Sequence, residues 1–122
     1  MTQNQKLTTL QAIAAIRRDA ALQDLAIATR RERSIRTVLA NLAATRLVNM
    51  ATAEPSDFAQ LDRYCQWTEA RRGAIESDLA EAAKVAETCR ARAVFALGRT
   101  NALEKIDLSL TAKLRAARAR RV

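Results

Sequence analysis

The segment from Asp57 to Arg118 carries a hydrophobic repeat that is sustained for well over four heptads. Positions spaced alternately four and three residues apart, from Leu61 to Ala117, are apolar in thirteen of seventeen cases. Such a repeat is typical of a coiled coil, because a supercoiled helix keeps one stripe turned toward a partner over this length. At ~1.5 Å per residue the helix would be about 90 Å long. It cannot bury its stripe against itself, so we expect the rest of the chain to supply its partner.

A second apolar stripe runs from about residue 6 to residue 52. Its residues are spaced by seven: Leu7, Ala14, Ala21, Ala28, Ile35 and Leu42. Five further residues are expected to widen it: Leu10, Ile13, Leu25, Val38 and Leu39. Between the two stripes lies Pro55, which cannot continue the helix behind it and disfavours a helical conformation at Glu54. The pattern therefore predicts two helices separated by one bend.

These features predict an all-α chain in which two long helices form an antiparallel coiled-coil hairpin. The single domain would cover residues 1–122, with one helix at about 6–52, a bend at 53–57 and a second helix at about 57–118. The composition agrees, because twenty-seven alanines, two glycines and only four aromatic residues suit an elongated helical protein better than a globular core. A bend centred near residue 54 would place residue i opposite residue 108 − i.

The sequence offers little of what catalysis or metal binding requires. It has no histidine, no glycine-rich loop that could cradle a phosphate, and no cysteine pair at metal-ligand spacing. Cys65 and Cys89 would lie about 36 Å apart on one helix, too far to bridge each other. We therefore expect a protein that is not an enzyme, with no catalytic residues, no metal site and no cofactor.

Charge is unevenly distributed along the chain, whose formal net charge is +8 with a pI near 10.7. Residues 1–53 carry +5, residues 54–87 carry −4 and residues 88–122 carry +7. An acidic protein partner is therefore expected. The same distribution predicts an acidic bend end and a basic end that holds both termini, an arrangement suited to two different partners.

Two sets of residues are candidate partner-binding sites. If residue i lies opposite residue 108 − i, the N-terminal end of the first helix reaches only to about Lys105. The part of the second helix beyond Lys105 is then left uncovered. That part would present an apolar stripe with neighbouring cations: Ile106, Leu110, Leu114, Arg115 and Arg118. The bend end would present a mainly aromatic group: Phe58, Leu61, Tyr64 and Trp67.

The chain also resembles the FliJ-like family, the coiled-coil stalk proteins of flagellar and type III secretion export apparatus. The resemblance lies in Leu7-x-x-Leu10, Arg17-Arg18 and Ala21 near the start, and in Gly98-Arg99, Leu103 and Ile106 near the end. It implies a cytoplasmic, non-enzymatic protein that couples the export ATPase to the export gate. The end with both termini would then sit in the ATPase ring, and the bend would contact the gate.

Two other classes of protein compete with this interpretation. A homodimeric basic helical bundle that binds RNA or DNA would explain the arginines, but no aromatic residue interleaves the basic tail, so nucleic-acid binding is expected to be weak and non-specific. A membrane-surface protein is disfavoured because alanine stripes bury little area in lipid. The longest uncharged run, Leu7–Ile16, is too short to span a bilayer. Since an alanine-rich hairpin has a small core, we expect either a homodimer or low stability in isolation.

Overall fold

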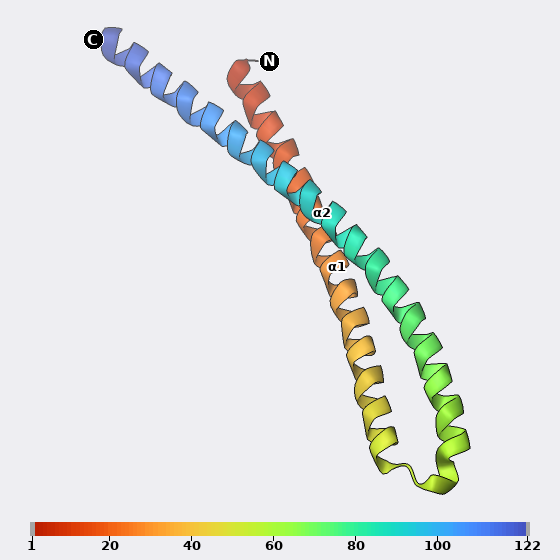
Figure 1. Ribbon diagram of the computed structural model, residues 1–122. Helices are drawn as coiled ribbons and strands as arrows, with labels where there is room; N and C mark the ends of the chain where they lie inside the picture. The colour runs from red at the N-terminus through yellow and green to blue at the C-terminus, as the bar shows by residue number, and fades with distance from the viewer. Residues whose placement is uncertain (1, 122) are drawn as a thin grey trace. The chain divides into compact units, whose positions relative to one another are not determined.

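The computed structural model describes residues 2–121 and consists of two long α-helices joined by one short turn (Figure 1). Helix α1 spans Gln3–Thr52, the 3-10 turn η1 spans Pro55–Asp57 and helix α2 spans Phe58–Arg121. The two helices pack against each other as a hairpin, which confirms the predicted all-α fold.

The start of α1 is fixed by a capping box that the sequence analysis overlooked. The backbone N–H of Gln5 donates to the Thr2 hydroxyl at 3.2 Å, and the backbone N–H of Thr2 donates to Oε1 of Gln5 at 3.0 Å. These reciprocal bonds satisfy two donors that a helix start would otherwise leave unpaired. The helix therefore begins at Gln3, about three residues before the predicted start.

The bend is closed by Glu54 and Asp57 on either side of Pro55. Glu54 has an extended backbone, with φ −96° and ψ 160°. Its N–H donates to Oδ2 of Asp57 at 3.4 Å, and the Asp57 N–H donates to the Glu54 carbonyl at 2.9 Å. Proline fits the first position of the turn because it has no N–H that needs a partner there. The bend lies within the predicted range 53–57.

The chain divides into two compact units, each of which pairs one stretch of α1 with one stretch of α2. The bend unit comprises residues Ala26–Glu87 and contains the turn. The terminal unit comprises the residues up to Leu25 together with those from Thr88 onward.

The buried residues of both units lie on the predicted stripes. The bend unit buries Ala28, Thr68, Ile75, Ala82 and Ala86, and the terminal unit buries Leu7, Ala14, Cys89, Ala93 and Ala96. Six of these ten are alanines, so each pair of helix segments buries little apolar area per residue. Among the residues that the structure describes, Thr68 is the one buried polar side chain, and its hydroxyl donates to the Cys65 carbonyl at 2.9 Å.

The stripe of α1 is narrower than predicted. Leu10, Ile13 and Val38 stay exposed, whereas Leu25 and Leu39 are half-buried. The reason is the coiled-coil spacing of four and three residues, in which the positions spaced by seven alternate with intervening half-buried positions. Of the positions spaced by seven, Leu7, Ala14 and Ala28 are buried, whereas Ala21, Ile35 and Leu42 are half-buried. Those intervening positions are Gln11, Arg18, Leu25, Glu32, Leu39 and Arg46.

The helices are paired in a different register from the one predicted. In the bend unit, Nη1 of Arg46 lies 3.2 Å from Oε2 of Glu69. In the terminal unit, Ala14 and Thr100 line the same cavity. Both pairs place residue i near residue 114 − i, not 108 − i. The pairing is therefore centred near residue 57, three residues beyond the expected centre at residue 54, although the bend itself lies at 53–57.

This register can be tested with spin labels in a chain whose two cysteines are changed to alanine. Labels at Ile13→Cys and Ala102→Cys are expected to be closer than labels at Ile13→Cys and Phe95→Cys. Residues 95 and 102 are one heptad apart and so share a helix face, but they are separated by ~10 Å along the axis. Pulsed electron resonance measures both distances. A shorter distance for the pair with Phe95→Cys would instead support the register 108 − i.

Candidate partner-binding surfaces

The predicted aromatic group in the bend unit is partly exposed. Trp67 and Phe58 are 58% and 59% exposed, whereas Tyr64 and Leu61 are half-buried. The rings of Tyr64 and Trp67 are stacked, with centroids 6.3 Å apart and planes inclined by 28°. Because the stacked pair holds the indole in place, Trp67 presents a pre-ordered apolar surface that a partner could cover.

A groove in the bend unit is a second candidate surface, and the sequence analysis missed it. It has a volume of about 560 Å³ and an apolar lining contributed mainly by α1. The lining residues are Leu39, Leu42, Ala43, Arg46, Leu47, Met50, Thr68, Arg72 and Glu76. Leu47 is largely exposed and Met50 is about half exposed, because both lie off the buried stripe. Two apolar residues three apart on the flank of a stripe were the signal that could have revealed this groove.

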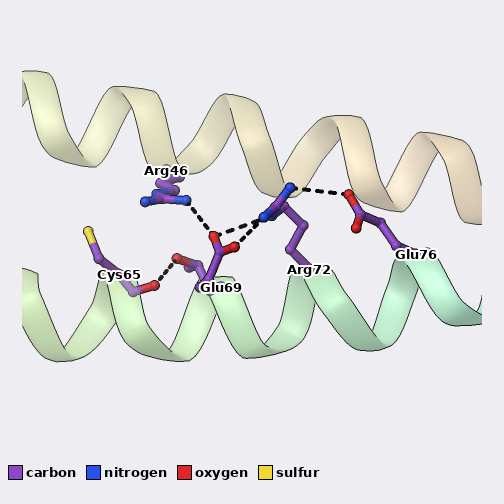
Figure 2. Close-up of polar contacts among 6 residues, drawn as sticks. Arg46, Cys65, Glu69, Arg72 and Glu76 are labelled. Atoms are coloured by element: carbon purple, nitrogen blue, oxygen red, sulfur yellow. Dashed lines mark hydrogen bonds and ion pairs between the residues drawn. The ribbon is translucent and has the colours of Figure 1, made fainter.

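Four charged side chains form an ion-pair network at the edge of this groove (Figure 2). Arg72 points toward α1 from between Glu69 and Glu76, and its guanidinium contacts both carboxylates. The distance from Nη1 of Arg72 to Oε1 of Glu76 is 3.2 Å, and Arg46 reaches Glu69 from α1 at 3.2 Å. The network explains how a stripe position can hold arginine, because the charged group extends out of the seam to paired carboxylates.

The network also shifts the pKa values of Glu69 and Arg72. The hydrogen bond from Arg72 lowers the pKa of Glu69 below its ordinary value, and the charges of Arg72 and Arg46 lower it further. The hydrogen bond from Glu69 correspondingly raises the pKa of Arg72. All of these side chains are substantially exposed, so water and salt screen the interaction and its contribution to stability is small.

This shift predicts a specific pH dependence. A carboxyl whose pKa is lowered on folding stabilises the folded chain above its unfolded pKa, here near 4.5, and loses that effect as the pH falls through the folded pKa. The melting temperature of Glu69→Gln should therefore be lower than that of the native chain at pH 7. The difference should disappear in more acidic solution, as followed by circular dichroism. A difference that persists unchanged at pH 2 would assign the effect to packing and not to the ion pair.

The two units differ in net charge. The bend unit carries nine basic and nine acidic residues and is neutral, because the arginines of its α1 segment offset the acidic stretch 54–87. The prediction of an acidic bend end therefore does not hold for this unit as a whole. The terminal unit carries twelve basic and four acidic residues, and thus the entire formal net charge of +8. The positive charge of the chain is therefore concentrated on the terminal unit.

The last turns of α2, within the terminal unit, form the other predicted site. Leu114 is 58% exposed, and Arg115 and Arg118 are exposed beside it. Ile106 is about half exposed and Leu110 is half-buried, because the observed register lets the first turns of α1 reach as far as residue 110. The uncovered part therefore starts near Thr111 instead of Lys105. The end of α2 lies apart from the start of α1 (Figure 1).

Within residues 2–121 there is no group of three or more histidine, cysteine, aspartate or glutamate residues that could hold a metal ion. Neither helix contains, over its described length, an apolar stretch sufficient to cross a membrane. No model of a known protein family, no curated protein and no solved structure matches the chain.

Proposed function

We propose that this chain is a non-enzymatic helical adaptor that binds protein partners through separate surfaces on its two units. The observation that carries the proposal is the uncovered end of α2, where Leu114 is exposed next to Arg115 and Arg118. A buried leucine supplies affinity in an interface, whereas cations at its rim steer an acidic partner toward it. The exposed Trp67 and Phe58 of the bend unit supply a second anchoring surface of different charge.

Within this class, we propose a cytoplasmic stalk or adaptor of a flagellar or type III secretion export apparatus. The basic terminal unit would enter the export ATPase ring, and the bend unit would contact the export gate. The support for this role is the helical hairpin, the concentration of positive charge in the terminal unit and the family resemblance of the sequence.

The test uses the purified export ATPase and the cytoplasmic part of the export gate from the same organism. Sedimentation of the full chain with each of them, and then with both, should show two binary complexes and one ternary complex. A partner that displaces the other would contradict the idea of separate surfaces. Failure to bind either one would remove the export role.

Binding of RNA or DNA remains the second candidate, because the whole net charge of +8 lies on one unit. If the attraction is only electrostatic, affinity for a duplex should fall steeply as salt is raised and should not depend on base sequence. Submicromolar and sequence-selective binding near physiological salt would favour the nucleic-acid role over the adaptor role.

A further inference from the structure

A second groove lies between α1 and α2 in the terminal unit, away from the uncovered end of α2. Its volume is about 210 Å³. The lining residues are Leu10, Ile13, Ala14, Arg17, Arg99, Ala102 and Leu103. Buried Ala14 contributes to the lining, whereas Leu10 and Ile13 are 50% and 42% exposed. These are two of the residues that were expected to pack in the seam but do not.

The apolar character of this face continues along α2. Phe95 and Ala102 are one heptad apart and so share a helix face, and Ile106 lies one helical turn beyond Ala102. Phe95 is largely exposed and Ile106 is about half exposed. The Arg99 guanidinium lies over the Phe95 ring, 5.9 Å from its centroid, so it is held beside the groove.

The groove is positively charged as well as apolar. Its lining includes two arginines and no acidic residue. Neither Arg17 nor Arg99 forms an ion pair with any carboxylate within the part of the chain that the structure describes. In the bend unit, by contrast, Arg46 and Arg72 beside the larger groove are both paired with glutamate.

We propose that this groove binds an acidic amphipathic helix of a partner protein. Apolar side chains of that helix would pack between Leu10, Ile13 and Leu103, and its carboxylates would pair with Arg17 and Arg99. Laying the apolar face of a helix into a groove between two others is a common mode of recognition, and it creates a local three-helix bundle. The inference goes beyond the export role and does not depend on it, because it concerns a surface separate from the last turns of α2.

Charge and shape favour this occupant over three others. A second copy of the chain would bring another unit of net charge +8 against the first. A bilayer surface is flat on this scale and cannot fill a groove that a helix ridge would fill. A nucleic-acid backbone would pair with the arginines but would leave Leu10 and Ile13 in contact with water, with no gain from their burial.

The probe for the test is a synthetic peptide of about 20 residues, ~30 Å long as a helix. It carries leucines at i, i+3 and i+7 and glutamates at the other positions. A peptide of the same composition in shuffled order, without the stripe, is the control. Binding to the full native chain is measured by fluorescence anisotropy, and methyl resonances of Leu10 and Ile13 report whether the peptide occupies the groove.

Two double variants are compared with matched controls. Leu10→Ser with Ile13→Ser should weaken binding of the striped peptide at least about tenfold, as should Arg17→Glu with Arg99→Glu. Two other exposed apolar residues of the same unit, changed by Ile16→Ser with Val94→Ser, should leave affinity within about twofold. Arg33→Glu with Arg63→Glu in the bend unit makes the same change in net charge and should also have little effect, because these charges lie beyond the reach of screened interactions.

Several results would overturn the proposal. Equal affinity for the striped and shuffled peptides, or equal losses from both pairs of arginine variants, would show non-specific electrostatic attraction. A native chain that is dimeric, ignores the peptide and becomes monomeric on the Leu10 and Ile13 changes would show that a second copy occupies the groove. Binding to anionic phosphatidylserine vesicles or to duplex DNA that those same changes abolish, without any peptide binding, would assign the groove to that ligand instead.

Discussion

The substitution Ala86→Asp is expected to unfold the helix pair of the bend unit. Ala86 is 1% exposed and lies, in the observed register, opposite buried Ala28. A carboxylate placed there would be taken out of water within the alanine seam, and an incompletely compensated buried charge costs about 3–5 kcal/mol. A small core seldom contributes more than about this amount to stability. The expected loss of folding free energy is therefore close to the whole stability of this pair of helix segments.

The matched control for this substitution is Ala80→Asp on the exposed face of the same helix. It introduces the same residue and the same change of charge, so it should cost only the difference in helix propensity, up to about 0.7 kcal/mol. Urea unfolding followed by circular dichroism compares the two. Similar stability of the two variants would show that the alanine seam does not hold the helices together.

The double substitution Leu110→Ser with Leu114→Ser is expected to abolish binding to the partner of the terminal unit. Leu114 is exposed and Leu110 is half-buried, on one stripe of α2. Each leucine that a partner buries would contribute about 1.5–3 kcal/mol, so losing both would weaken binding by two orders of magnitude or more. Leu114 lies in the uncovered turns and Leu110 is only half-buried at their edge, so the helical content should change little. Titration with the export ATPase ring measures the affinity.

Leu108→Ser is the control for this stripe, since Leu108 is equally exposed but lies on the opposite face of α2. It should leave the affinity nearly unchanged. Arg115→Glu with Arg118→Glu should act mainly by slowing association, and less so at high salt. If the serine changes lowered the helical content while partner binding survived, the leucines would be packing residues and not a binding surface.

The periodic features of the sequence predicted the core accurately. Within residues 2–121, each of the ten buried residues, from Leu7 to Ala96, occupies a position on one of the two predicted stripes. This success has a physical cause, since a long helix without breakers can bury only the residues that recur every three to four positions. The bend was predicted equally well, because Pro55 excludes a continuous helix.

Features that depend on three-dimensional geometry were predicted less well. The register was wrong because the pairing is centred near residue 57, and the hydrophobic repeat does not encode where that centre lies. The grooves were missed because they form between flanking residues of two helices. Gly98 does not mark a close approach of the two helices, since no atom of α1 lies within 4 Å of where its β-carbon would be.

The most direct test of the adaptor proposal is amide hydrogen exchange along α2, with and without the export ATPase ring. In the free chain, residues 111–121 should exchange faster than the buried stretch around Ala93, because no other segment covers them. With the ring at about ten times its dissociation constant, exchange of residues 111–121 should slow about tenfold. Unchanged exchange there in the presence of the ring would contradict the proposal. So would protection that rises with the concentration of the free chain, since it would show that a second copy covers this segment.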